Sequence, residues 1–271
     1  MLDRIGLDDR SGLWIEARPF ADCPPMALDL RSPFQRRIYY FPYAHQRYYL
    51  NPRVRALFAR TLTAGATYLD IGANLGFLAF HASRAVGPTG RVYAFEPEPR
   101  TFASLSRSAA LQPAANVRCL QCALSAREEP ARALFRAVDG TAHSLHREQA
   151  SHPRVYDDES LVRITSLDAL VRGGEVDVRG LALVKIDVEG EEARTIEGML
   201  ETLDRTGCPP IWIEVRGPDG STRAPDTFAA VLAQVRPLGY AAFRLIDDRE
   251  EPVGVADVRG REDVLLRRTR P

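Results

Sequence analysis

From residue 66 to the end of the chain, short apolar runs typical of buried strands alternate with segments whose apolar residues recur at helical spacing. The strand-like runs are 66–71, 91–96, 117–124, 181–188, 210–215, 241–246 and 263–268, and the helix-like segments are 76–86, 99–111, 166–171, 191–203 and 225–239. Parallel neighbouring strands need a crossover connection, so this alternation predicts a mostly parallel sheet with helices on both faces. No clear helix joins the last two runs, which predicts an antiparallel final strand. The expected fold is α/β and Rossmann-like, with a seven-stranded mixed sheet.

Composition limits the partners of such a fold. The 271 residues are 45% hydrophobic, and 36 basic and 36 acidic side chains give a formal net charge of +0, so no overall field would attract nucleic acid. No apolar run approaches the ~20 residues that span a bilayer, and the first residues lack the order of a signal peptide. We expect a cytoplasmic protein without a nucleic-acid partner or a membrane span.

Residues 1–60 precede the first strand of the sheet and have a different character. Tyr, Phe and Arg are concentrated in residues 31–62. Aromatic side chains supply large apolar contact areas, either to a ligand or to the core of the protein. We therefore interpret residues 1–60 as an N-terminal extension that is a lid, a substrate-binding segment or simply a packed addition.

A short loop with two glycines follows the first strand, in the sequence "DIGANLG". In an open parallel sheet, ligands bind at the carboxyl ends of the strands, near the point where the first strand turns into its helix. Gly72 permits a tight turn and a close approach of the backbone to a ligand, and Gly76 opens the helix. The N–H groups of a helix N-terminus attract a carboxylate or phosphate. Asp70 and Asn74 complete this predicted binding loop.

The surroundings of the loop indicate which ligand it binds. Neither the Gly-x-Gly-x-x-Gly fingerprint of dinucleotide enzymes nor the Gly-Lys-Ser/Thr of a phosphate loop is present. Asp70 precedes the loop, and Glu96 ends the second strand, where a carboxylate accepts hydrogen bonds from vicinal ribose hydroxyls. Carboxylates at both ends suit a ligand with an ammonium, a sulfonium and a carboxylate, such as S-adenosylmethionine.

With "DIGANLG", "FEPEP", "ITSLDALV" and "KIDVEGEE" in this order and spacing, the chain resembles the FkbM family of S-adenosylmethionine-dependent methyltransferases over residues 49–215. The resemblance implies a class I methyltransferase domain, which we assign to residues 61–271. It also implies transfer of a methyl group, usually to a hydroxyl of a secondary metabolite or sugar.

The resemblance further implies a set of site residues. The first cofactor motif matches Asp70, Gly72, Asn74 and Gly76, and Glu96 matches the ribose-binding acid, with Pro97 beside it. Residues 122–125, with Ala123 among them, match the segment that flanks the adenine. Asp187 and Glu189 match the family signature at the tip of the fourth strand.

Methyl transfer from a sulfonium is an in-line displacement, so alignment of the reacting atoms supplies most of the catalysis. A hydroxyl acceptor also needs a group that takes its proton. Asp187 is our candidate base, or else it orders only the methionine end of the cofactor. Glu189 either contacts the acceptor or stabilises a helix dipole. His143, with His146, is either a base on a loop over the site or a solvated loop histidine.

A divalent cation is the alternative way to position an acceptor. Asp187 and Glu214 end neighbouring predicted strands, and carboxylate oxygens suit magnesium. Ion pairs with Lys185 or Arg216 explain the same carboxylates without a metal, and we favour this interpretation. Cys119 and Cys122 lie three apart on a predicted strand and point to opposite faces, which disfavours a zinc site.

Two other functions are compatible with such a sheet. One is a nicotinamide-dependent oxidoreductase, which the missing third glycine disfavours. The other is a methyltransferase-like module that binds without turnover, and the intact acids at Asp70, Glu96 and Asp187 disfavour it. The identity of the acceptor and the oligomeric state leave no signal in the sequence.

Overall fold

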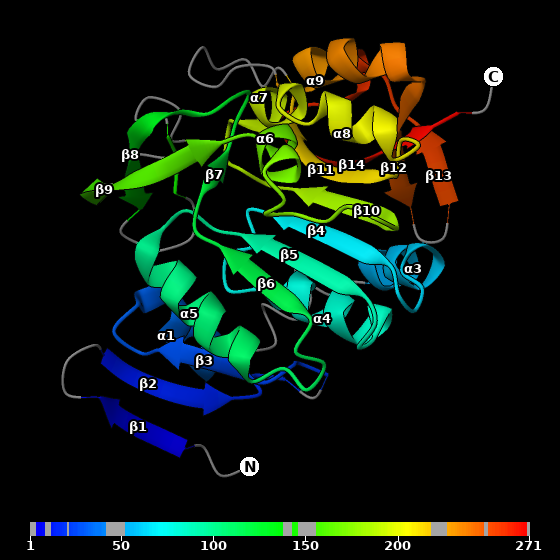
Figure 1. The fold of residues 1–271 in the computed structure, drawn as a ribbon. Helices are drawn as coiled ribbons and strands as arrows, with labels where there is room; N and C mark the ends of the chain where they lie inside the picture. The colour runs from blue at the N-terminus through cyan, green and yellow to red at the C-terminus, as the bar shows by residue number, and fades with distance from the viewer. Residues whose placement is uncertain are drawn as a thin grey trace.

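A computed structural model describes residues 4–8, 12–20, 22–41, 52–137, 143–145, 156–217, 227–246 and 249–269. Within these residues the central sheet has the strand order β13-β12-β14-β11-β10-β4-β5-β6 (Figure 1). Its strands are β4 (Thr67–Ile71), β5 (Arg91–Phe95), β6 (Val117–Leu120), β10 (Leu181–Ile186), β11 (Ile211–Arg216), β12 (Tyr240–Ile246), β13 (Arg249–Pro252) and β14 (Arg261–Arg268). The five strands from β11 to β6 are parallel, and β14 lies antiparallel between β11 and β12.

The predicted mixed sheet of the class I type, with an antiparallel last strand, is therefore confirmed. Each of the seven predicted runs contributes a strand to it. The structure adds β13, which pairs with β12 at the edge of the sheet. Its sequence, Arg-Glu-Glu-Pro, has no apolar pattern, and ion pairs of Glu250 with Arg60 at 2.6 Å and with Arg267 accompany it. A strand of charged residues gives no hydrophobic signal in the sequence.

Helices cover both faces of the sheet, and each face has its own apolar core (Figure 1). On one face lie α3 (Pro52–Thr61), α4 (Phe77–Val86) and α5 (Pro99–Ala110). The other face is covered by α6 (Leu167–Arg172), α7 (Glu192–Glu197), α8 (Leu200–Arg205) and α9 (Thr227–Val235). Two 3₁₀ turns, η2 (Arg236–Leu238) and η3 (Val255–Asp257), follow α9 in the chain. Alternate residues of the central strands face opposite cores, as Tyr68 and Leu69 do.

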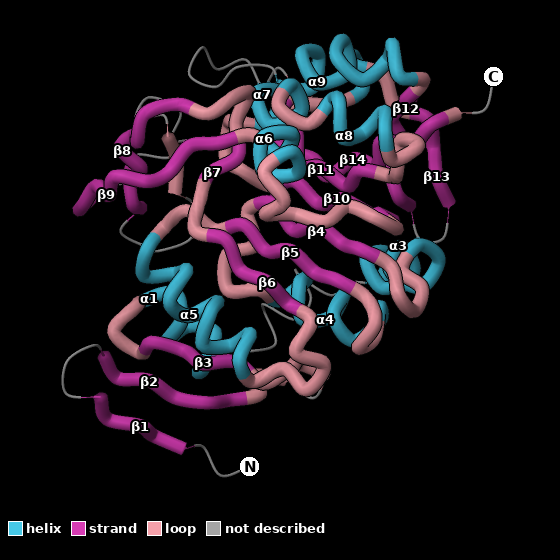
Figure 2. Tube along the Cα trace, in the orientation of Figure 1, coloured by secondary structure: helices cyan, strands magenta, loops and turns pink. Residues whose placement is uncertain are grey.

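A smaller sheet stands beside the carboxyl edge of the central one (Figure 2). It consists of β7 (Ala123–Leu124), β9 (Tyr156–Thr165) and β8 (Glu129–Ala137) in that order. The prediction of one strand over 117–124 is wrong, because the chain leaves the central sheet after β6 and pairs with β9 instead. The sequence patterns predicted no strand in place of β8 or β9. In β9 the buried Val162 and Ile164 are separated and flanked by the exposed Arg163 and Leu161, so the strand has no continuous buried apolar run.

The N-terminal extension is a packed unit. Strands β1 (Arg4–Asp8), β2 (Gly12–Ala17) and β3 (Met26–Asp29) form an antiparallel sheet, which α1 (Pro33–Tyr40) follows. Ser108 of α5 accepts a hydrogen bond from the backbone N–H of Ala27 at 2.9 Å, and the Gln35 amide donates to Ser104 of α5 at 2.9 Å. These buried bonds fix β3 and α1 against α5. None of the described helices is long and apolar enough to cross a membrane.

Candidate active site

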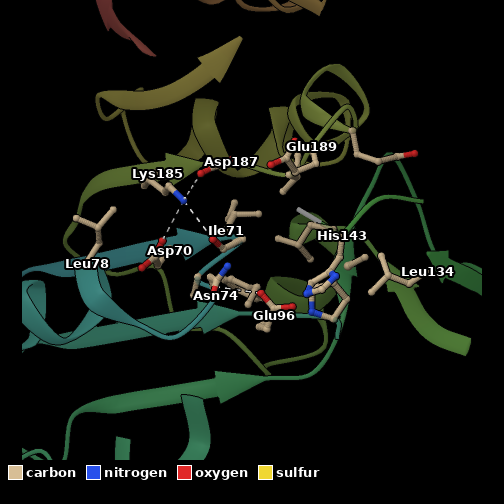
Figure 3. Close-up of a pocket in the computed structure, with 18 of the residues that line it drawn as sticks. Asp70, Ile71, Asn74, Leu78, Glu96, Leu134, His143, Lys185, Asp187 and Glu189 are labelled. Atoms are coloured by element: carbon tan, nitrogen blue, oxygen red, sulfur yellow. Dashed lines mark hydrogen bonds and ion pairs between the residues drawn. The ribbon is translucent and has the colours of Figure 1, made fainter. Parts of the chain in front are cut away.

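A cavity of about 890 Å³ lies at the carboxyl ends of β4, β5 and β10 (Figure 3). Its walls are the loops after these three strands, the segment 122–124 and residues 143 and 145. The extension contributes side chains from α1 and from the residue after it, namely Phe34, Arg37 and Phe41. Ligand pockets of proteins have volumes of roughly 300–1,000 Å³. The cavity is thus of ligand size and stands where open α/β sheets bind their ligands.

The loop after β4 packs directly against the end of β10. Gly72 has φ +78°, and a Cβ atom there would lie 1.9 Å from the carbonyl oxygen of Asp187. Asn74 also adopts a left-handed backbone, with φ +51°. Gly76 does not line the cavity. Its φ is +86°, and a Cβ would lie 2.6 Å from side-chain atoms of Leu105 and Phe80, so this glycine serves the close packing at the start of α4.

Lys185 connects Asp70, the loop and Asp187 (Figure 3). Its ammonium donates to the carbonyl oxygen of Gly72 at 3.1 Å and to Oδ2 of Asp187 at 3.3 Å, and it lies 3.9 Å from Oδ1 of Asp70. Burial opposes the charge of Lys185, but the carboxylates of Asp187 and Asp70 raise its pKa overall. Burial raises the pKa of Asp70 to about 6, although Lys185 opposes the shift. The ammonium therefore compensates two carboxylates at once.

Glu96 is buried at the end of β5 and ties two loops together. One carboxylate oxygen accepts the N–H of Asn74 at 3.0 Å, and the other accepts the N–H of Glu98 at 2.9 Å. Each oxygen keeps a further lone pair for a ligand. Burial raises the pKa of Glu96 to about 8, against the N–H bond from Glu98. Pro97 and Ala123 line the same part of the cavity.

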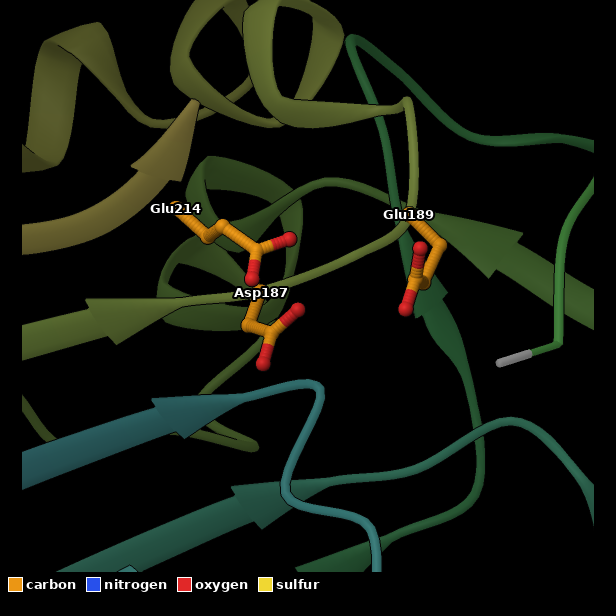
Figure 4. A group of neighbouring side chains, drawn as sticks. All are labelled: Asp187, Glu189 and Glu214. Carbon is orange, nitrogen blue, oxygen red and sulfur yellow. The ribbon is translucent and has the colours of Figure 1, made fainter. Parts of the chain in front are cut away.

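Three carboxylates from neighbouring strand ends gather on the β10 side, with one oxygen each of Asp187, Glu189 and Glu214 within 4.8 Å of one another (Figure 4). Burial and the charge of Asp187 raise the pKa of Glu214 to about 9 and also raise the pKa of Glu189. Nε of Arg261, on β14, forms an ion pair with Glu214 at 2.8 Å, and the same guanidinium pairs with Glu189. Arg216 lies 3.7 Å from Glu189.

His143 lines the cavity. Figure 3 shows its imidazole on the side of the pocket away from Lys185 and Asp70. The neighbouring Ser144 forms a bridge with Phe135 of β8, and its hydroxyl donates to the carbonyl oxygen of Glu189 at 3.2 Å. His146 lies outside the described residues.

Comparison with known proteins assigns the chain to a family. The methyltransferase FkbM domain matches residues 70–241, which is more than half of the chain. The chain belongs to this family. A curated relative by sequence is Methyltransferase 1 of Beauveria bassiana (strain ARSEF 2860), 27% identical over 146 residues. The match covers 48% of this chain and 57% of that protein, so the chain spans little more than half of the relative's length.

Solved structures of other methyltransferases resemble the FkbM chain weakly. Precorrin-6y C5,15-methyltransferase from Geobacter metallireducens GS-15 is 14% identical, with a TM-score of 0.44 over 81% of this chain and 88% of that one. A putative rRNA-methylase from Clostridium thermocellum is 12% identical, with a TM-score of 0.46 over 78% of this chain and 90% of that one. Neither similarity bears on the acceptor of the FkbM protein.

Several residues of this site were not predicted from the sequence or were given a smaller role than the structure indicates. Lys185 was considered only as an ion-pair partner, although it is the one lysine among 36 basic residues of the chain and stands two positions before Asp187 on the same strand face. Both features were signals of its importance. Arg261 joins the site only through the pairing of β14 with β11, and the contribution of α1 depends on tertiary packing. The sequence carries no signal for either.

Proposed function

We propose that this FkbM-family protein moves a methyl group from S-adenosylmethionine to a hydroxyl of a small molecule, such as a secondary metabolite or sugar. The observation that supports it best is the position of Asp187, a carboxylate at the edge of the ligand-sized cavity, held by Lys185 next to the loop that carries the cofactor motif. Family membership supports the reaction class.

The pocket fits the proposed cofactor. Oδ1 of Asp70 and Oδ1 of Asn74 are buried and accept no hydrogen bond from any described residue, so both are ready for donors of a ligand. The close approach at Gly72 leaves no room for a side chain where the backbone would meet the methionine end. In the proposal, Asp70, Gly72, Asn74 and Gly76 form this part of the site, with Gly76 acting through the loop geometry.

The adenosyl end is assigned to the opposite wall. Glu96 keeps lone pairs for the ribose hydroxyls, with Pro97 beside it. Ala123 lines the cavity next to the predicted adenine position. Because each oxygen of Glu96 already accepts a backbone N–H, the carboxylate stands in a fixed orientation before any ligand arrives.

The cofactor supplies a methyl group made electrophilic by the sulfonium. The protein supplies alignment and a destination for the acceptor proton. Asp187 takes this proton, while Lys185 holds its carboxylate at 3.3 Å. Glu189 contacts the acceptor from the turn after β10, where its φ of +52° turns the backbone sharply. His143 faces the same cavity as a second candidate base.

The extension is proposed as a substrate-binding segment. Phe34, Arg37 and Phe41 line the cavity from α1 and its C-terminal end. Phe41 is 67% exposed, although an aromatic side chain of this size is normally buried. An aromatic and cationic rim of this kind suits an acceptor with a ring or an anionic group. The part of the extension at 42–51 lies outside the described residues.

Two measurements test this proposal. Thermal unfolding with S-adenosylhomocysteine and with NAD separates a methyltransferase from an oxidoreductase, because a ligand at 100 times its dissociation constant stabilises by about 2.7 kcal/mol. We expect stabilisation by S-adenosylhomocysteine alone. Mass spectrometry after incubation with isotope-labelled S-adenosylmethionine and fractionated cell extract should then find a labelled methyl on oxygen. Stabilisation by NAD alone, or cofactor binding with no labelled product in any fraction, would contradict the proposal.

A further inference from the structure

The cluster of Asp187, Glu189 and Glu214 has the appearance of a cation site, because three carboxylates from adjacent strand ends converge within 4.8 Å (Figure 4). Like charges this close repel one another strongly when they are shielded from water. Asp263, which pairs with Glu214 in the β11–β14 register, adds the charge of a further carboxylate to the cluster. The cluster therefore needs a positive partner in its centre.

The partner is a side chain of the protein. Arg261 is the first residue of β14, and its guanidinium reaches across to the end of β11 and the turn after β10. Nε forms an ion pair with Oε1 of Glu214 at 2.8 Å, and Nη2 pairs with Glu189. Two of the three clustered acids are thus joined by one cation. Asp187, the third acid, is among the groups that raise the pKa of Arg261.

A guanidinium and a metal ion differ in the arrangement of oxygen atoms that stabilises them. Its planar fork matches carboxylates, stays charged at every physiological pH and offers five N–H donors. The pairs with Glu189 and Glu214 use two of these donors, and Arg261 also lines the cavity. Magnesium needs oxygen ligands at roughly 2.0–2.1 Å on all sides, and a guanidinium between two of those oxygens takes the space and adds repulsion.

We propose that Arg261 is the built-in cation of this acid cluster: its guanidinium occupies the position of a divalent ion and directs its remaining N–H groups at the acceptor oxygen. The part that concerns the acceptor rests on the proposed O-methyl transfer. In that reaction the acceptor hydroxyl gives its proton to Asp187, and its oxygen forms the new bond to the methyl carbon. The electron pair of the breaking carbon–sulfur bond goes to sulfur. Arg261 stabilises the negative charge that develops on the acceptor oxygen.

Manganese binding tests the occupied position without any acceptor. Isothermal titration and electron paramagnetic resonance compare the wild-type protein with Arg261→Ala. Arg267→Ala is the matched control, because Arg267 lies on the same strand and pairs with Glu250, away from the cluster. We expect Arg261→Ala to gain one Mn²⁺ site at least about tenfold tighter than any in the wild type or the control, since removal of the guanidinium leaves Glu214 without its ion pair and lowers the positive charge next to Glu189 and Asp187. Adding Glu214→Gln should remove the gained site.

Two results would overturn the proposal. One is a wild-type protein that binds Mn²⁺ at the cluster, as shown by loss of the site in Glu214→Gln alone. The other is Arg261→Ala with no gained Mn²⁺ site. If Arg261→Ala unfolds, Arg261→Gln removes the charge and keeps most of the side-chain volume, and its circular dichroism and Mn²⁺ titration answer the same question.

Turnover measurements provide a second, independent test of the role of Arg261. Exhaustive chelation should leave wild-type turnover unchanged, whereas Arg261→Gln should lower kcat by roughly 100-fold or more with little change in cofactor binding. Turnover that chelator abolishes and magnesium restores would contradict the role of Arg261. A protein without any methyl transfer would contradict the proposed function, while the Mn²⁺ titration would still decide the occupancy of the cluster.

Discussion

Lys185 is the residue on which most of the pocket depends. Its ammonium contacts the cofactor loop at Gly72 and the proposed base Asp187, and it lies near buried Asp70. Removal of one partner from a buried ion pair leaves the other charge unpaired, at a cost of about 3–5 kcal/mol. We expect Lys185→Met to lower the free energy of unfolding by about this amount. Urea unfolding followed by circular dichroism measures the change.

The control for Lys185 is Arg179→Met. Arg179 pairs with Asp177 on the surface, where water screens an ion pair and leaves it little effect on stability. If both substitutions cost the same, the ammonium of Lys185 has no special part in holding the loop. Lys185→Arg tests the shape of the group, since the larger planar guanidinium does not fit the position of a compact ammonium.

Asp187 is the residue at which chemistry and cofactor binding are separable. Asp187→Asn keeps the shape and part of the hydrogen bonding while it removes charge and basicity. We expect unchanged affinity for S-adenosylmethionine and a turnover lower by roughly 100- to 10,000-fold, the effect of a lost general base. Calorimetry and initial rates provide the two numbers. A dissociation constant that rises in step with the loss of rate would make Asp187 a ligand of the methionine end instead.

At the scale of elements, the contact between the β4 loop and the end of β10 decides the geometry of the pocket. Gly72 and Gly65 have nearly the same backbone, with φ +78° and +83°. A Cβ at Gly72 would lie 1.9 Å from the carbonyl oxygen of Asp187, whereas at Gly65 the nearest atom is 3.6 Å away. Gly65→Ala should cost about 1–2 kcal/mol through its left-handed backbone alone.

Gly72→Ala should cost clearly more than Gly65→Ala and should abolish binding of S-adenosylhomocysteine, because the loop must move away from β10. Thermal unfolding and calorimetry on both variants measure the difference. Equal destabilisation with intact binding would mean that the close approach at Gly72 has no bearing on the cofactor site.

The elements also show where sequence patterns suffice and where they do not. The parallel strands β4, β5, β10 and β11 are continuous apolar runs with polar side chains at or near their ends, so the strands and a ligand site at their carboxyl ends were predictable. In β8 and β9 the buried apolar side chains do not follow one another along the strand, and β13 has no apolar side chain outside its proline, so these strands were missed. Arg261 joins the pocket through strand register, which depends on tertiary pairing.

For the whole molecule, the buried acids predict a dependence of stability on pH. Burial raises the pKa of Glu96 from its usual 4.5 to about 8, so the folded state holds a proton that the unfolded state releases above about pH 4.5. The stability contributed by Glu96 is therefore complete below pH 4.5 and is lost as pH rises toward 8. We expect Glu96→Gln to reduce the decline of the unfolding free energy between pH 5 and pH 8 by a few kcal/mol, roughly 1.4 per pKa unit. Parallel slopes for wild type and variant in urea unfolding at pH 5, 6, 7 and 8 would contradict this.

A chain with a single lysine carries its own site-specific probe. Lys185 is buried at the floor of the pocket, and the remaining basic side chains are arginines, which amine reagents do not modify. Growth on ¹⁵N-lysine would give one side-chain resonance, and its chemical shift would follow the charge around the sulfonium position directly. Lys185 is the one lysine amine of this sequence that an acylating reagent could modify, and the rate at which it reacts would report both its access to solvent and the small fraction of neutral amine that the neighbouring carboxylates allow.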